Sequence, residues 1–335
     1  NKDGITKQNL TTPCSTRDII PMNNPNRTCK TAQQCYTPST LTTEQAFQRY
    51  EDIRDRLPKA DFPENSILTH SLQGVANHVD AFVLDAFGVL NVGQTPIPDA
   101  VNRMAELRAT GKKLVVLTNG ASDPRTSAIK KYHKLGFDFG PHEVVASREV
   151  CGVRLTEHLP NGRWGAICAK GDDFTDLNAN IVAWNSASPV EVDAFILLSS
   201  EQLNEETYVA LRDEIVKAPR PVLVANPDIV APREEGLTLE PGFFAHRLID
   251  ETGVKPVFFG KPFMNAYDDV KECLRGTPPH RIAMVGDTLH TDILGGAAAG
   301  FRTVLISNFG LFANHDAHDF IDRSGIRPDF VCKVT

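Results

Sequence analysis

From residue 80 onward the chain alternates between short apolar runs and segments with helical periodicity. The apolar runs occupy 81–84, 113–117, 144–146, 165–169, 194–198, 221–225, 281–285 and 303–306. The helical patterns between several of them cover 99–110, 124–135, 204–217, 262–274 and 291–299. Runs that are apolar throughout are typical of strands buried on both faces, and their alternation with helices predicts a parallel sheet covered by helices. We therefore expect an α/β fold with a doubly wound parallel sheet.

Polar residues that follow the apolar runs are candidate site residues, because ligands of such sheets bind outside the carboxyl ends of the strands. Each of these residues alone is an ordinary turn former or helix cap. Together they offer carboxylates, a hydroxyl beside free backbone amides, and one lysine. Such a set can bind Mg²⁺ through oxygen, hold a phosphate and supply a carboxylate nucleophile. The sequence thus predicts a phosphate-handling site formed by Asp85, Thr118, Asn119, Lys261, Asp287 and, five residues further on, Asp292.

The four segments that carry these residues resemble, in order, motifs I to IV of the haloacid dehalogenase (HAD)-like hydrolase superfamily. The insertion between the second and third, with the phrase Ala225-Asn226-Pro227-Asp228 followed by Pro232-Arg233-Glu234, resembles the class IIA branch. That branch contains 4-nitrophenylphosphatase, nucleotidase and sugar-phosphatase-like enzymes. The similarity covers residues 79–308, and its most specific stretch is 286–296. Residues 1–60 have no counterpart in this pattern.

The resemblance implies a domain organisation and an activity. The Rossmann-like HAD core is expected at 62–150 plus 256–335, with an inserted α/β cap domain at 151–255. Residues 1–61 are expected to form an N-terminal tail and helix, partly disordered. The implied activity is Mg²⁺-dependent hydrolysis of a small phosphorylated metabolite: a sugar phosphate, a nucleotide or a phosphoester with a good leaving group. Relatives commonly form homodimers through the cap.

Roles for the metal-binding residues follow from the same resemblance. Asp85 would attack phosphorus, form an aspartyl-phosphate and also bind Mg²⁺. The backbone carbonyl of Phe87 and the carboxylate of Asp287 would complete the protein ligands. Asp292 would orient these groups rather than bind the metal directly.

Phosphate and substrate contacts are implied for a second group of residues. The Thr118 hydroxyl and the Asn119 amide would hold phosphate oxygens, and Lys261 would neutralise the negative charge between nucleophile and phosphate. Arg233, in the cap loop, is a candidate contact to an anionic leaving group, with a surface salt bridge as the alternative. Arg125 is a candidate phosphate contact, with a charge at a helix N-terminus as the alternative.

Phe87 departs from the pattern of the phosphatases. Their residue two positions after the nucleophile is normally a second Asp, which protonates the leaving oxygen and then activates water. A phenyl ring moves no protons, and loss of a general acid–base typically costs about 10²–10⁴ in rate. Three interpretations stay open: a phosphatase for good leaving groups or with a substitute acid, a weakly catalytic protein that binds a phosphate ligand, and another reaction of the superfamily. Some class IIA relatives carry an aromatic residue here.

Other polar residues near the motifs have simpler interpretations. His290, inside the fourth motif, is expected to be a solvent-facing loop histidine, with a substitute proton carrier as the alternative. Asn91 is expected to form a turn, with a substrate contact as the alternative. Cys151 and Cys168 have no histidine at a recognisable spacing and are expected to be small buried residues.

Composition limits the cellular setting. Lys and Arg total 35 and Asp and Glu total 42, which gives a net charge of −7 and argues against nucleic-acid and basic membrane-surface proteins. No apolar run approaches the ~20 residues of a membrane span. Seven cysteines in 335 residues are typical of reduced thiols. We expect a cytoplasmic protein with no nucleic-acid or membrane partner.

The N-terminal region differs from the rest. Residues 1–40 are rich in Thr, Asn, Pro and Lys and contain three of the seven cysteines. This composition favours a flexible tail, with an ordered or disulfide-bearing arm as the alternative. A helix is expected to begin after Thr42 as N-cap and to end at Leu57, before Pro58.

Overall fold

The computed structural model describes residues 41–187 and 189–335. The predictions of a flexible tail and of a cysteine-bearing arm fall on residues 1–40 and lie outside this range. Within it, no helix combines the length and hydropathy that a membrane span requires.

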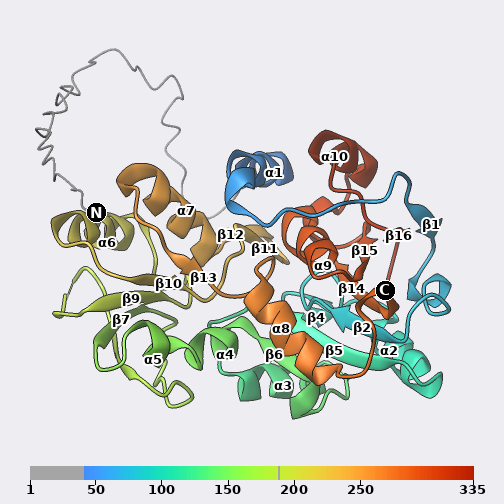
Figure 1. Cartoon of the computed structure of the whole chain (residues 1–335), viewed down its shortest axis with the longest axis horizontal. Helices are drawn as coiled ribbons and strands as arrows, with labels where there is room; N and C mark the ends of the chain where they lie inside the picture. The colour runs from blue at the N-terminus through green and yellow to red at the C-terminus, as the bar shows by residue number, and fades with distance from the viewer. Residues whose placement is uncertain (1–40, 188) are drawn as a thin grey trace, which may run out of the picture. The chain divides into compact units, whose positions relative to one another are not determined.

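The larger sheet has seven parallel strands (Figure 1). Its spatial order is β1 (Ile67–Thr69), β16 (Phe330–Cys332), β15 (Arg302–Ile306), β14 (Ile282–Gly286), β2 (Ala81–Leu84), β5 (Lys113–Thr118) and β6 (Val144–Ala146). From β2 the chain proceeds through β5 to β6 on one side and later through β14, β15 and β16 on the other. The direction of winding therefore reverses between β2 and β14, the position where doubly wound sheets bind ligands. The predicted fold class is confirmed.

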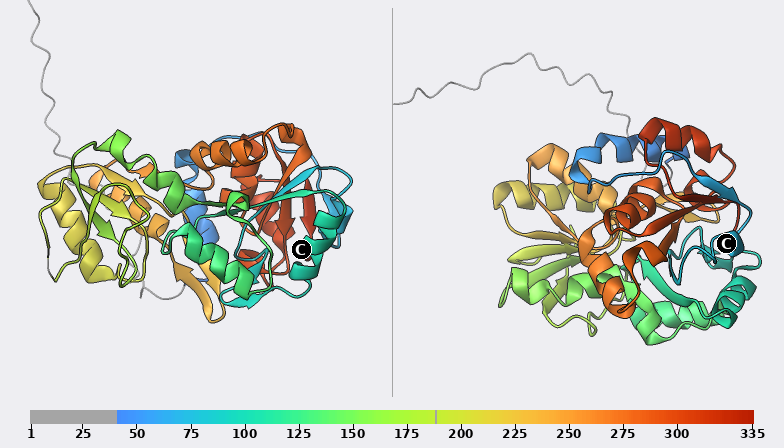
Figure 2. Two further views of the ribbon diagram at one scale, coloured as in Figure 1. Left: turned by 90° about the horizontal axis from the view of Figure 1, so that it is seen from below. Right: turned by 45° about the vertical axis from the view of Figure 1, so that its right-hand side comes forward.

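The smaller sheet has five parallel strands and lies apart from the larger one in both views of Figure 2. Its order is β13 (Val257–Phe258), β10 (Val222–Val224), β9 (Ala194–Leu197), β7 (Arg163–Ile167) and β8 (Asn180–Ala183). Most of these strands come from the insertion predicted as the cap. The exception is β13, which follows the predicted boundary at residue 255 yet pairs with β10. The cap sheet therefore extends to Phe258, and the expectation that the second core segment begins at residue 256 is wrong for this strand.

Two antiparallel hairpins complete the strands. One joins β3 (Asn91–Val92) to β4 (Thr95–Pro96), and the other joins β11 (Val230–Arg233) to β12 (Gly236–Leu239). The second hairpin follows the Asn226-Pro227-Asp228 segment of the cap.

The α-helices of the described residues include every segment in which periodicity predicts a helix, and also four that the sequence patterns do not predict, at 147–152, 155–158, 241–252 and 317–324. The helices are α1 (Thr43–Asp52), α2 (Ala100–Ala109), α3 (Arg125–Lys134), α4 (Ser147–Gly152), α5 (Leu155–His158), α6 (Glu205–Lys217), α7 (Pro241–Thr252), α8 (Met264–Cys273), α9 (Leu294–Ala298) and α10 (Ala317–Ser324). Segment 291–299, predicted as one helix, is a π-helical turn over Leu289–Ile293 followed by α9. A further short 3-10 turn at Arg54–Arg56 follows α1.

The start of α1 shows how local chemistry sets a helix boundary. Thr42 accepts a hydrogen bond from the backbone N–H of Gln45, whose side chain accepts one from the backbone of Thr42 in return. This reciprocal pair satisfies two amides that have no partner inside the helix. The N-cap prediction is confirmed, although the α-helix ends at Asp52 and not near Leu57.

Candidate active site

Three aspartates meet at the point where the winding of the larger sheet reverses. Asp85 follows β2, Asp287 follows β14, and the two strands are neighbours. Asp292 lies in the π-helical turn after β14. One carboxylate oxygen from each of the three lies within 4.8 Å of the other two. The three aspartates therefore lie together, as the prediction of a single site requires.

Lys261 reaches this cluster from the other sheet. It lies in the segment between β13 and α8, and its side chain is almost fully buried. Its ammonium nitrogen is 2.5 Å from Asp85 Oδ1 and 2.8 Å from Asp292 Oδ1. A single lysine thus pairs with two carboxylates, and the segment that ends the cap sheet supplies it.

The charges in the cluster do not balance. Burial raises the pKa of Asp85 to about 7 against the opposing effect of Lys261, and burial together with Asp292 and Asp85 raises the pKa of Asp287 well above its usual range. Burial alone would lower the pKa of Lys261, yet the carboxylates around it raise that pKa well above its usual value. The site therefore has an excess of negative charge that a bound cation would stabilise.

Asp287 is fixed by hydrogen bonds to both of its oxygens. The Thr288 hydroxyl donates to Oδ1 at 2.9 Å, and the backbone N–H of Leu311 donates to Oδ2 at 2.7 Å. Gly310, before Leu311, has a φ of +78°, and a Cβ there would lie 1.8 Å from Oδ2. Only glycine lets the loop after β15 approach the carboxylate this closely.

Hydrogen bonds of the side chains of Thr118 and Asn119 fix the segment at the end of β5. Thr118 Oγ1 accepts a hydrogen bond from the backbone N–H of Gly120 at 3.1 Å. The side-chain nitrogen of Asn119 donates to the carbonyl of Lys261 at 2.9 Å and to Asp228 Oδ1 at 2.8 Å, and its oxygen accepts from Lys261 N at 2.7 Å. The Asn119 side chain therefore connects its own segment to those of Asp228 and Lys261.

Asp228 was not among the predicted site residues. It follows β10 in the cap, and its bond to Asn119 brings it to the wall of the site. Loss of hydration raises the pKa of its carboxyl to about 7, with Lys261 opposing that rise. Its position after an apolar strand, like that of Asp85, is the sequence signal that points to this carboxylate.

The Phe87 ring forms part of the site wall and contacts two cations. Lys131, on α3, places its ammonium nitrogen 4.6 Å from the ring centre, and Arg233 of β11 places its guanidinium carbon at 4.5 Å. Arg233 also pairs with Glu240 at 3.1 Å. Burial and Arg233 lower the pKa of Lys131 to about 8. No sequence pattern distinguishes Lys131 from its neighbours on the helix.

Arg125 is not among the residues that line the cavity. It lies at the start of α3 and pairs with Glu149 at 3.0 Å. The structure thus brings together Asp85, Phe87, Thr118, Asn119, Arg233 and Asp287 along one cavity, with Lys261 and Asp292 behind them.

The cavity itself is narrow, with a volume of about 40 Å³. Since one water needs about 10–15 Å³ of such space, it holds only a few waters. One wall comes from the core and the other from Asn226, Asp228 and the 230–233 strand of the cap.

The expectation for His290 is wrong. Its ring is fully buried, stacks on Tyr50 with centres 4.9 Å apart, and places Nε2 2.5 Å from Glu51 Oε1. The aromatic residues of α1 remove it from solvent, which no pattern inside the fourth motif indicates. The bond from Asn91 Nδ2 to the carbonyl of Gly93 agrees with the predicted turn.

Cys151 and Cys168 are both buried and free, as expected. Burial raises the pKa of the Cys151 thiol, and burial raises that of Cys168 to about 11. Both side chains are therefore thiols rather than thiolates near neutral pH, which suits a packing role.

Comparison with known proteins decides the family. Residues 82–178 match the family model described as haloacid dehalogenase-like hydrolase, and residues 258–334 match a second model described as HAD-hydrolase-like. The chain belongs to the haloacid dehalogenase-like hydrolases. The two matched regions include all the aspartates of the cluster and Lys261, so the family assignment and the geometry concern the same residues.

Relatives of this HAD-like hydrolase include phosphatases. The chain is 29% identical to the human glycerol-3-phosphate phosphatase over 289 residues, 77% of this chain and 89% of that protein. A possible sugar phosphatase from Cytophaga hutchinsonii is 26% identical with a TM-score of 0.72, covering 81% of this chain and 98% of that one. The glycerol phosphate phosphatase Rv1692 from Mycobacterium tuberculosis, solved with magnesium, shares the fold at 23% identity and a TM-score of 0.62, covering 77% of this chain and 75% of that one.

Proposed function

We propose that this HAD-like hydrolase is a Mg²⁺-dependent phosphatase that acts on a small phosphorylated metabolite through an aspartyl-phosphate on Asp85. The observation that carries the proposal is the convergence of three aspartates and Lys261 beside the Thr118–Asn119 turn. The similarity to proteins named as a glycerol-3-phosphate phosphatase and an acid sugar phosphatase supports a small phosphorylated metabolite as the substrate.

The residues present fit a divalent cation. Burial raises the pKa values of two of these carboxyl groups, those of Asp85 and Asp287, and the neighbouring carboxylates raise them further. Carboxylate oxygens are the ligands that Mg²⁺ prefers. Asp85, Asp287 and the backbone carbonyl of Phe87 would hold the ion. When bound, it would polarise the phosphoryl oxygens and offset the charge that accumulates in the transition state.

The side chains then divide the chemistry between them. An oxygen of Asp85 attacks phosphorus, so that the Asp85–phosphorus bond forms while the bond to the leaving oxygen breaks, and the electron pair goes to the leaving group. Lys261 favours the ionised form of Asp85 and holds its oxygen in place. The Thr118 hydroxyl and the N–H of Asn119 hold the transferred group. Water then hydrolyses the aspartyl-phosphate and restores Asp85.

The departure at Phe87 supports a restricted substrate range. With no proton donor at that position, leaving groups that are stable as anions are favoured. The second candidate function, a weakly catalytic protein that binds a phosphate ligand, rests on the same observation. The two candidates differ in turnover and not in the ligand they recognise.

Hydrolysis of 4-nitrophenyl phosphate and acetyl phosphate tests the proposal. Wild type and Asp85→Asn are assayed with Mg²⁺ and with EDTA. Activity that needs both the metal and Asp85 supports the phosphatase. Rates equal to those of Asp85→Asn would reject it in favour of the phosphate-binding protein.

A further inference from the structure

Helix α1 lies outside the family pattern, yet it contacts both the cap and the core. In Figure 1 it lies between α7 of the cap and α10 of the core. On the cap side, Arg49 pairs with Asp250 of α7 at 2.6 Å, and Arg56 pairs with the same carboxylate. On the core side, the Thr43 hydroxyl donates to the carbonyl of Leu311 at 3.0 Å. Leu311 is the residue whose N–H binds Asp287.

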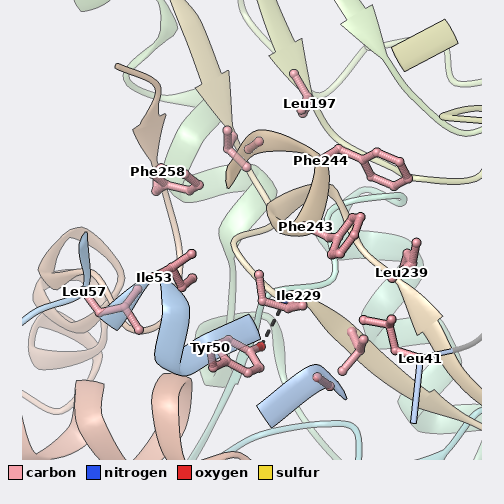
Figure 3. Close-up of a cluster of buried hydrophobic side chains, with 14 of the residues drawn as sticks. Leu41, Tyr50, Ile53, Leu57, Leu197, Ile229, Leu239, Phe243, Phe244 and Phe258 are labelled. Carbon is pink, nitrogen blue, oxygen red and sulfur yellow. Dashed lines mark hydrogen bonds between the residues drawn. The ribbon is translucent and has the colours of Figure 1, made fainter. Parts of the chain in front are cut away.

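A continuous apolar cluster lies beneath these polar contacts. It joins residues of α1 and the following turn to residues of the cap, as Figure 3 shows. The members from the N-terminal segment are Leu41, Phe47, Tyr50, Ile53 and Leu57, and those of the cap include Ile229, Leu239, Phe243, Phe244 and Phe258. Burial of such side chains on both partners stabilises the contact between α1 and the cap.

Tyr50 occupies the centre of this arrangement. Its ring lies parallel to that of His290, at 7°, with centres 4.9 Å apart. Its hydroxyl oxygen accepts a hydrogen bond from the backbone N–H of Ile229 at 3.1 Å. His290 lies between Asp287 and Asp292 in sequence, and Ile229 directly follows Asp228. One side chain therefore connects the metal-binding segment to the cap loop that forms a wall of the cavity.

The connection continues into the phosphate site. Asp228 accepts a hydrogen bond from Asn119, and Asn119 binds both backbone groups of Lys261. The Lys261 ammonium then contacts Asp85. A displacement of the loop at Ile229 would therefore move Asn119 and the phosphate-binding turn with it.

We propose that Tyr50 is a positioning residue of the active site, which fixes the Asp228–Ile229 loop so that Asn119 presents the phosphate-binding turn correctly. The inference rests on the proposed function, since it assigns the phosphate site as the group being positioned. It gives the N-terminal helix a role in ligand binding that the family's own motifs do not contain.

Tyr50→Phe isolates this role, because it keeps the ring against His290 and removes only the acceptor of the Ile229 N–H. Binding of inorganic phosphate in the presence of Mg²⁺ is measured by titration calorimetry on the full chain. A buried N–H without a partner drives the loop away from its position, so we expect the Kd for phosphate to rise about tenfold. A merely destabilised protein would bind fewer equivalents with an unchanged Kd.

Tyr208→Phe is the matched control. It removes the hydroxyl of another buried tyrosine, on α6 of the cap, and should leave the Kd within twofold of wild type. An unchanged Kd in Tyr50→Phe, or an equal rise in both variants, overturns the proposal.

If Tyr50→Phe does not fold, the double variant Arg49→Gln, Arg56→Gln is used instead, because it loosens α1 from Asp250. A Kd at least threefold higher supports the proposal, and an unchanged Kd overturns it.

Two further measurements separate this proposal from the proposed function. Hydrogen exchange of the 226–231 peptide should accelerate in Tyr50→Phe relative to β14, whether or not the protein hydrolyses anything. In steady-state assays the KM for 4-nitrophenyl phosphate should rise with the phosphate Kd while kcat changes little. Wild type that binds phosphate but turns over nothing would reject the phosphatase and leave the Tyr50 comparison intact. Equal exchange of this peptide in wild type and Tyr50→Phe would reject the role of Tyr50 and leave the proposed function untouched.

Discussion

The ammonium nitrogen of Lys131 lies 4.6 Å from the centre of the Phe87 ring. The guanidinium carbon of Arg233 lies 4.5 Å from the same centre, so two cations contact one aromatic side chain in the wall of the cavity. Cations near the face of an aromatic ring are attracted to it by about 0.5–2 kcal/mol. A carboxylate introduced at this position would be held in its ionised form by both cations.

Phe87→Asp should therefore accelerate hydrolysis of the aspartyl-phosphate more than its formation. An ionised carboxylate can accept a proton from water but cannot donate one to the leaving oxygen. We expect wild type to show a burst of 4-nitrophenol followed by slow turnover, and Phe87→Asp to raise the slow phase about 100-fold and remove the burst. Rapid-mixing absorbance measurements follow both phases. Phe87→Asn matches the size of Asp without accepting a proton, and equal rates in the two variants would contradict the expectation.

Gly310→Ala should damage the metal site through backbone geometry alone. The residue has a φ of +78°, and an added Cβ would lie 1.8 Å from Asp287 Oδ2, so the carboxylate must move. The Mg²⁺ concentration for half-maximal activity should rise at least about tenfold, because ligand position controls metal affinity. Gly325→Ala is the matched control, with a φ of +67° and open space around it. It should lower the free energy of unfolding by about 1–2 kcal/mol while leaving the Mg²⁺ dependence unchanged. Equal Mg²⁺ dependence in both variants would refute the steric explanation.

Much of the fold can be predicted from the sequence, because parallel strands covered by helices on both faces form continuous apolar runs. The runs at 81–84, 113–117 and 282–285 became adjacent strands, which placed Asp85, Thr118 and Asp287 at one edge. The sequence does not show which of the two sheets a strand joins. The run at 257–259 has the same composition as a core strand, and only its pairing with β10 assigns it to the cap.

The missed parts of the site depend on contacts between segments far apart in the chain. His290 is buried because α1, more than 200 residues earlier, covers it. Lys131 is notable only because Phe87 and Arg233 lie beside it. Periodicity and strand-end rules describe local structure, and none of them reports which distant surface will cover a residue.

The raised pKa of Asp228, about 7 in the folded chain, makes stability depend on pH. Its value in the unfolded chain is near 3.9, so the folded protein binds more protons between these two values. The stabilising contribution is complete below about pH 4 and is lost as the pH rises through 7. Asp228→Asn lacks this dependence. In EDTA the variant should gain about 2 kcal/mol of unfolding free energy over wild type between pH 4 and pH 8, less than the full linkage because Asp228 keeps some solvent contact. Urea unfolding at several pH values measures the difference, and a constant difference across that range would contradict the assignment.

Arg148 offers a test of buried charge in the connection between core and cap. Its side chain is fully buried on α4, where it makes two hydrogen bonds to each of Asp172 and Asp176 and one to the carbonyl of Ala121 at 3.2 Å. These bonds raise the pKa of Arg148 against the effect of burial.

A lysine cannot reproduce the planar fork that these five bonds require. Arg148→Lys should therefore lower the unfolding free energy by about 2–3 kcal/mol. Arg148→Met should lower it by about 3–5 kcal/mol, because it leaves the buried carboxylate of Asp172 and the partly exposed carboxylate of Asp176 without their counter-charge. Arg212→Met is the control, since Arg212 pairs with Asp213 and Glu251 at a partly exposed position and its replacement should cost less than about 1 kcal/mol. Chemical denaturation followed by circular dichroism compares the variants. A midpoint for Arg148→Lys equal to that of wild type would show that charge alone, without the fork geometry, holds the 172–176 loop beside the Ala121 carbonyl.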